Sequence, residues 1–214
     1  MIALALTLLA APQSTWYVDP SVAGPGRGTQ SDPYSRVDFA VSRPLTVNGD
    51  TLILDDGIYP DERISMGSKR LQIVAATGAS PVLRTDGVTS LLTAGTHSSL
   101  TAIGLRFEGP TNPTAALTSR GGGINASGDE LVILNCSFAH CGARNGGAIY
   151  SVSQPVALGG VTSESTCHAE NNGGGVWHLG SPLVIEDSDI NAYTLYGNGG
   201  GIYMDQGSLM VLDS

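Results

Sequence analysis

The sequence predicts an all-β fold: a right-handed parallel β-helix (solenoid) of about seven coils with a short N-terminal cap. A glycine cluster followed by an apolar β-former recurs along the chain, as RGGGIN, NGGAIY, NGGGVW and NGGGIY. The apolar residues after these clusters are spaced by 25, 27 and 26 residues: Ile124, Ile149, Val176 and Ile202. A fixed period of roughly this length is typical of repeat architectures, in which one coil stacks on the next.

A second apolar residue follows each of these four by seven positions: Leu131, Val156, Leu183 and Leu209. Each opens a short run rich in Leu, Val and Ile, which predicts a strand. The same offset upstream, in Leu45–Leu52, Ile64–Leu71 and Thr93–Leu100, predicts three earlier units. Helical periodicity between the strands is missing, which argues against βαβ units.

The composition agrees with a folded, turn-rich chain that is not a nucleic-acid binder. Of 214 residues 29 are glycine, only 14% are charged, and the net charge is −9. A nucleic-acid-binding surface needs a basic face. All ten Lys and Arg residues lie at or before Arg144, so the C-terminal third is purely acidic.

Three segments are expected along the chain. Residues 1–15 are an apolar run that ends in small residues, and the run is too short to span a bilayer. It predicts a signal peptide that is cleaved between Ala11 and Thr15. The alternative is a short buried strand. Residues 16–44 are expected to form the N-terminal cap, with a short amphipathic helix in 34–42. The solenoid is expected over 45–214 and to continue in a longer protein, since LMVLDS stops one strand into a repeat.

Asparagine recurs four residues before three of the apolar positions, as Asn145, Asn172 and Asn198. These residues are expected to lie above one another as a structural ladder, because stacked side-chain amides can hydrogen-bond along the axis. Arg120 holds the same place one coil earlier and would end the ladder.

Two stretches resemble a known superfamily. WYVDP (16–20) with NGDTLILDDGIY (48–59) is similar to the entry segment of the pectate-lyase-like right-handed parallel β-helices, and GGAI (146–149) resembles the repeats of bacterial polymorphic outer-membrane proteins. The resemblance implies a secreted, cell-surface or outer-membrane location and a polysaccharide or surface-protein partner. It also implies that enzymes of this kind use acidic calcium ligands and an Arg or Lys base on neighbouring coils. No such set carries over, and Phe138 is followed three residues later by Cys141 where the surface repeats have Asn.

Four acidic residues are candidate calcium ligands. Asp187 and Asp213 are 26 positions apart and are expected to stack, with Glu186 and Asp189 supplying further oxygen atoms. Calcium prefers six to eight oxygen ligands. The alternative is that the two stacked residues are turn residues that bond to local amides.

Three aromatic residues directly follow the apolar positions on successive coils: Tyr150, Trp177 and Tyr203. Alternation along a strand would place them on the outer face as an exposed column. Such a column is suited to sugar rings or to a protein partner, although a loop could cover it instead.

The three cysteines, Cys136, Cys141 and Cys167, are an odd number without zinc spacing, so they are expected to be small buried side chains. No acid–base constellation identifies catalytic residues. The sequence therefore favours a non-catalytic surface or extracellular module that binds polysaccharide or a protein. The alternative is an enzyme: a polysaccharide lyase that uses calcium-assisted β-elimination, or a glycoside hydrolase.

Overall fold

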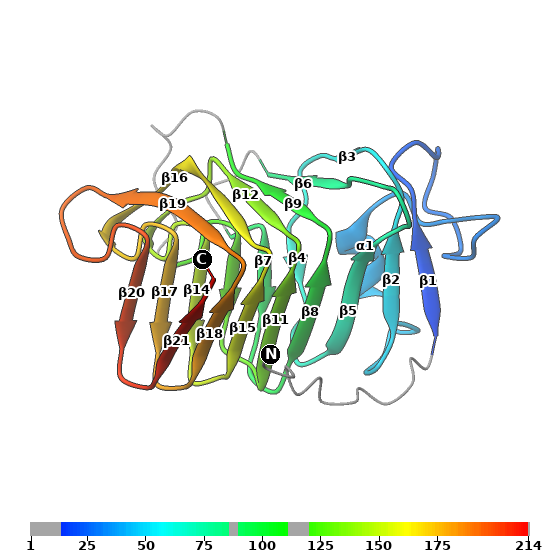
Figure 1. Cartoon of the computed structure of the whole chain (residues 1–214). Helices are drawn as coiled ribbons and strands as arrows, with labels where there is room; N and C mark the ends of the chain where they lie inside the picture. Colours follow the sequence, from blue (N-terminus) through cyan, green and yellow to red (C-terminus); the bar gives the residue numbers. More distant parts are fainter. Residues whose placement is uncertain (1–13, 86–89, 111–119, 214) are drawn as a thin grey trace.

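The computed structural model describes residues 14–85, 90–110 and 120–213. In these segments the chain winds as a right-handed parallel β-solenoid with three sheets that run along its length (Figure 1), which confirms the predicted fold class. Parallel pairing places successive coils side by side, one strand spacing apart.

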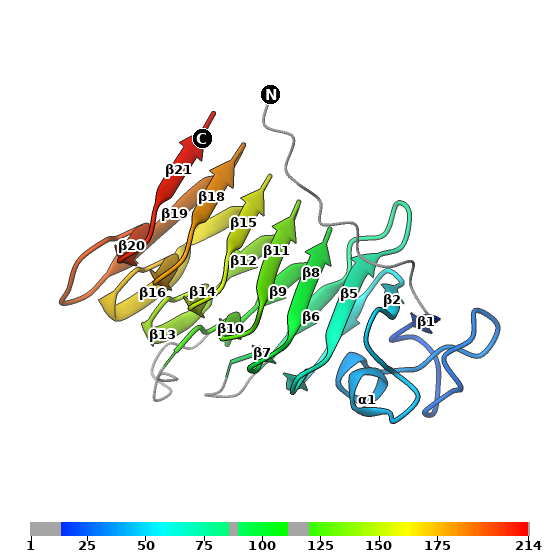
Figure 2. The same ribbon diagram turned by 90° about the horizontal axis from the view of Figure 1, so that it is seen from below.

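The first sheet has eight strands, and all its neighbours pair in parallel. Its strands lie in sequence order along the solenoid, as Figures 1 and 2 show. They are β1 (Thr15–Val18), β2 (Thr51–Leu54), β5 (Arg70–Ala75), β8 (Ser99–Ile103), β11 (Glu130–Leu134), β15 (Val156–Gly159), β18 (Leu183–Glu186) and β21 (Leu209–Leu212).

The second sheet has seven strands: β3 (Ile58–Tyr59), β6 (Val82–Arg84), β9 (Arg106–Glu108), β12 (Ser137–Ala139), β13 (Gly142–Asn145), β16 (Thr162–Asn172) and β19 (Asp189–Thr194). The third has six: β4 (Ile64–Ser65), β7 (Leu92–Ala94), β10 (Ile124–Ala126), β14 (Ile149–Val152), β17 (Val176–Leu179) and β20 (Ile202–Asp205). Because every complete coil needs a strand in each sheet, the described chain has fewer complete coils than the seven predicted.

The predicted register holds in the glycine-rich half of the chain. Ile149 pairs with Val176 and Val176 with Ile202 in the third sheet, as expected. In the first sheet the second apolar positions also pair in order, from Leu131 through Val156 and Leu183 to Leu209.

Three upstream positions were predicted wrongly. Leu52 pairs with Ile73 and not with Leu71, and Leu45 is exposed outside any strand. The chain enters β2 directly from the cap. The connection of seven positions that joins the third sheet to the first in later coils is therefore missing at this point. Leu92, not Thr93, pairs with Ile124, because the buried apolar residue takes the inward place and the corner to Leu100 is one residue longer.

The glycine clusters form the corners that precede the third sheet. The first glycine of each cluster has a left-handed φ, which is +64° at Gly146 and +65° at Gly173. The second glycine lies where two coils approach closely: a Cβ on Gly147 would lie 2.1 Å from the carbonyl oxygen of Gly174. Glycine meets both requirements because it has no Cβ. The third place tolerates a side chain, since Ala148 occupies it.

The core runs along the axis between the three sheets. Inward side chains such as Leu71, Leu100 and Leu131 are buried and stack coil upon coil. Phe107 and Phe138 stack in the same way, with ring centroids 5.0 Å apart and planes 10° apart. Stacked apolar side chains exclude water along the length of the solenoid.

The N-terminal cap contains the predicted helix, α1 (Val37–Ser42), whose Val37, Ala40 and Val41 are buried. The helix lies at the β1 end of the solenoid (Figure 2) and contacts β4 and β1. Strand β1 extends the first sheet by pairing with β2. The predicted signal peptide falls almost entirely on residues 1–13, outside the described residues. In the described part of the chain, no helix has the length and apolar character needed to cross a membrane.

The close approach at the corners is testable by placing a methyl group there. Gly147→Ala is expected to reduce the free energy of unfolding by roughly 3 kcal/mol or more. The backbone carbonyl groups of Gly174 and His168 would have to move to make room for the added methyl group. The matched control is Gly78→Ala, where φ is +81° but nothing lies within 4 Å of the added Cβ. Its expected cost is about 1–2 kcal/mol. Urea denaturation of both variants measures the difference, and equal costs would contradict the packing argument.

Candidate binding surface

The aromatic column exists and is continuous. Trp177 pairs in register with Tyr150 on one side and with Tyr203 on the other. The Tyr150 and Trp177 ring centroids are 4.4 Å apart with planes 4° apart, and the Trp177 and Tyr203 centroids are 6.2 Å apart with planes 14° apart. The outer side of the third sheet therefore carries three stacked rings. They belong to β14, β17 and β20, which lie side by side in Figure 1.

The column is less open than an exposed row of rings. Tyr150 is only 7% exposed, whereas Trp177 and Tyr203 are half-buried. The Arg120 guanidinium carbon lies 5.1 Å from the Tyr150 ring centroid, a cation–π distance. The prediction of an exposed column is thus wrong for Tyr150, because the Trp177 ring stacks on it and the Arg120 guanidinium from the preceding corner also covers it.

The stacking decides which parts of the rings can meet a ligand. Both faces of Trp177 are directed at neighbouring rings, so its outward edge is the part left for contact. Among the described residues, Tyr203 has a ring on one face only. The surface therefore presents ring edges in a row, with Tyr203 at the end of the row.

Asn145, Asn172 and Asn198 are brought together as predicted. Asn145 pairs with Asn172, and the Asn172 Oδ1 atom accepts a hydrogen bond from the Asn198 backbone N–H at 2.9 Å. The backbone continues the contact, because the Gly146 N–H donates to the Asn172 carbonyl oxygen. The contact between the last two residues is thus from side chain to backbone, and a ladder of side-chain amides remains a prediction.

The acidic residues are only partly brought together. Asp187 and Asp213 follow the paired residues Glu186 and Leu212, so they are neighbours on adjacent coils. Both have left-handed φ values, +49° and +45°, which is the geometry of turn residues at a corner. Asp189 lies on β19 and pairs with Thr162 in the second sheet. Within residues 14–85, 90–110 and 120–213, no three His, Cys, Asp or Glu side chains form a group that could hold a metal ion. Calcium remains a prediction without an assembled site.

Two arginines that a lyase could use as a base, Arg84 and Arg106, are paired with carboxylates. Arg106 lies 2.7 Å from Glu164 and 3.6 Å from Glu108, which also lies 3.0 Å from Arg84. The pair Arg84–Glu108 links β6 to the adjacent β9, and Arg106–Glu164 links β9 to β16 across β12. The arrangement holds the guanidinium groups as charged partners, which does not suit the removal of a proton.

A buried polar pair lies on the inner side of the column strands. The Ser151 hydroxyl lies 2.5 Å from His178 Nδ1, and His178 Nε2 lies 2.8 Å from the Ser181 carbonyl oxygen. The Nε2–H therefore donates to the carbonyl, and Nδ1 accepts from the hydroxyl. Burial lowers the pKa of His178, which favours this neutral form. The inward orientation of His178 could have been predicted from the sequence, because His178 lies two places after the inward-facing Val176 on the same strand.

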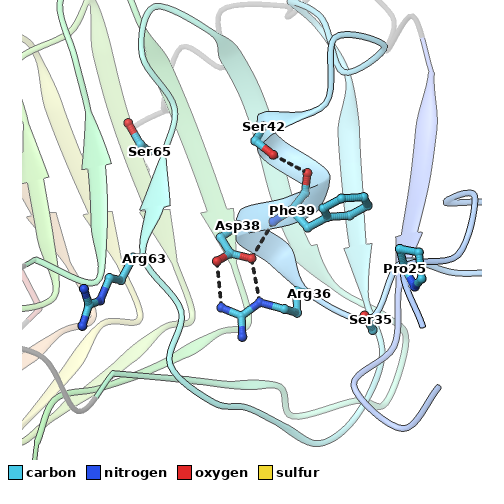
Figure 3. Close-up of a pocket in the computed structure, with 8 residues that line it drawn as sticks. All are labelled: Pro25, Ser35, Arg36, Asp38, Phe39, Ser42, Arg63 and Ser65. Carbon is cyan, nitrogen blue, oxygen red and sulfur yellow. Dashed lines mark hydrogen bonds and ion pairs between the residues drawn. The ribbon is translucent and has the colours of Figure 1, made fainter. Parts of the chain in front are cut away.

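A surface pocket of about 530 Å³ lies beside the cap helix (Figure 3). Arg36 and Asp38 face each other in it, with hydrogen bonds of 2.9 and 2.7 Å. Arg36 and Asp38 satisfy each other, and Arg63 adds a second guanidinium to the lining. Sequence reasoning missed the pocket, since it lies between the cap helix, a cap loop and the β4 segment, which are far apart along the chain. Its lining residues are Pro25, Ser35, Arg36, Asp38, Phe39, Ser42, Arg63 and Ser65.

Glu62 is a buried carboxyl group that binds the start of the cap helix. Its two carboxyl oxygens accept hydrogen bonds from the backbone N–H groups of Val37 and Asp38, at 2.9 and 2.7 Å. The side chain is fully buried. Burial raises the pKa of the Glu62 carboxyl to about 7, although the two hydrogen bonds act in the opposite direction.

Comparisons of the chain with protein-family models, with curated proteins and with solved structures find no match. The structure shows a parallel β-solenoid of stacked coils, which is consistent with a pectate-lyase-like fold. Membership of that superfamily remains a resemblance.

Glu62 makes a specific prediction for stability against pH. Its folded pKa of about 7 exceeds the ordinary value of 4.5, so between these pH values the folded protein holds a proton that the unfolded chain releases. The contribution of this residue to the free energy of unfolding should therefore fall as pH rises through this range, by roughly 3 kcal/mol at most.

Urea denaturation across this pH range measures the effect. Glu62→Gln should remove this component, whereas Glu186→Gln, at the other end of the solenoid, should retain it. The same pH slope in the wild type and in Glu62→Gln would contradict the assignment.

Proposed function

We propose that this chain is a non-catalytic binding module, secreted or displayed at a cell surface, which binds polysaccharide along one flank of its solenoid. The observation that carries the proposal is the column of Tyr150, Trp177 and Tyr203 on three successive coils. A surface that repeats along the axis is suited to a ligand that is itself a repeating, extended chain.

The chemistry of the ring edges supports this choice. Tyrosine and tryptophan combine a rigid apolar body with a polar group that can hydrogen-bond to hydroxyl groups. Side chains already held in a stack lose little conformational entropy when a ligand binds. A protein partner, the other ligand class suggested by the sequence, would meet the same preorganised surface.

The enzyme alternative has weaker support. β-Elimination needs a cation to acidify the sugar carbon and a basic group to remove its proton. Arg84 and Arg106 are held in ion pairs on the second sheet, away from the stacked Asp187 and Asp213 at another corner. The module reading therefore accounts better for the arrangement of the charges.

Retention on insoluble polysaccharides tests the binding surface. Tyr203→Ala and Trp177→Ala should each weaken retention about tenfold, because each removes an aromatic contact from a short row. Trp177→Phe should retain most of the binding, because it preserves a ring in the stack. Tyr196→Ala is the matched control, since Tyr196 is 86% exposed and lies outside the column. Equal retention of all four variants would refute the proposed surface.

Catalysis is tested separately on the same protein. Pectate and alginate are incubated with it, with and without calcium, and the release of unsaturated uronate is followed by ultraviolet absorbance. The proposal expects no product above the buffer control. Clear release of product would identify the chain as a lyase and overturn the non-catalytic assignment.

A further inference from the structure

Two of the three cysteines are neighbours on adjacent coils. Gly142 pairs with His168 in the second sheet, so the residues directly before them, Cys141 and Cys167, lie next to each other. The His168 N–H donates to the Cys141 carbonyl oxygen at 3.0 Å, which fixes this place in the ladder. Both side chains are fully buried in the core.

The two cysteines occupy adjacent places in the core, and neither takes part in a disulfide. Neighbouring strands lie about 4.8 Å apart, within the roughly 4.4–6.8 Å that separates the Cα atoms of disulfides. The backbone therefore needs no large movement to join them.

Cys136 is not part of this pair. Its Sγ atom lies 3.4 Å from the Leu134 carbonyl oxygen and 3.6 Å from that of Ala102. The odd number of cysteines in the sequence is thus one pair and one separate thiol, which the count alone does not reveal.

We propose that Cys141 and Cys167 are an oxidation site, which forms a disulfide between two adjacent coils when the chain folds in the presence of a small-molecule disulfide. One thiolate attacks a sulfur atom of the oxidant, and a thiolate leaves. The second cysteine loses its proton and attacks the mixed disulfide, which releases the second thiol of the oxidant. The two cysteines are oxidised by two electrons, and the oxidant is reduced to two thiols.

Both side chains are inaccessible in the folded protein. The exchange with the oxidant therefore takes place during folding, before the core closes, and either cysteine can attack first. The product is shielded from reductants afterwards.

Refolding with oxidised glutathione tests the proposal. The product is denatured and alkylated, and its mass is measured. The wild type should lose two hydrogen atoms and retain one alkylatable thiol of three. Its melting temperature should exceed that of protein refolded with a reductant by roughly 5–10 °C, because the bond closes a loop of 26 residues. Under native conditions, a reductant should open the bond only slowly.

Single variants assign the bond. Cys136→Ser should still form it, leaving no alkylatable thiol, whereas Cys141→Ser and Cys167→Ser should each retain two. Circular dichroism establishes that each variant has folded, and the wild-type mass serves as a readout that requires no variant. Three alkylatable thiols in oxidised wild type, or a bond that is lost in Cys136→Ser, would overturn the proposal.

Discussion

The structure depends on the hydrogen bonds that join each coil to the next in parallel. This ladder makes residues one coil apart in the sequence into direct neighbours, as with Ile149, Val176 and Ile202. In a middle coil, each side chain therefore contacts the side chains at the same place in the coil before it and the coil after it. Each such contact stabilises the interface between two coils. Apolar side chains stacked in this way form the core. Polar side chains stacked in this way must hydrogen-bond or pair with each other at the distance between adjacent strands.

The same constraint explains why the functional surface is preorganised and partly closed. Rings at equivalent places stack on each other, so a column both stabilises the coils and displays only its edges. Trp177 illustrates this dual role, since it lies between two tyrosines and is still half-buried. The thiols of Cys141 and Cys167 meet for the same geometric reason. Binding and redox chemistry are thus proposed at places where the repeat aligns side chains of one kind.

The sequence predicts the parts of the molecule that repeat and fails where the repeat stops. Val176 was placed correctly because a left-handed glycine fixes the start of each strand. Leu52 was misplaced, since it follows the cap and no earlier coil sets its register. Alternation gives the face on which Tyr150 lies, but it does not show that Arg120 covers the ring. Glu62 was missed because its partners lie in the non-repeating cap.

The corners differ in their freedom to change length. Between the third and first sheets the connection from Ile149 to Val156 is matched, residue for residue, by that from Val176 to Leu183. The glycine corners before the third sheet are also constrained, because a Cβ on Gly147 or Gly174 would meet backbone oxygen atoms of the next coil. In these later coils the differences in length therefore fall on the second sheet, where β16 is 11 residues long and its pairing shifts register. Evolution can enlarge the molecule on that side, and new surface can arise there while the other two sides remain unchanged.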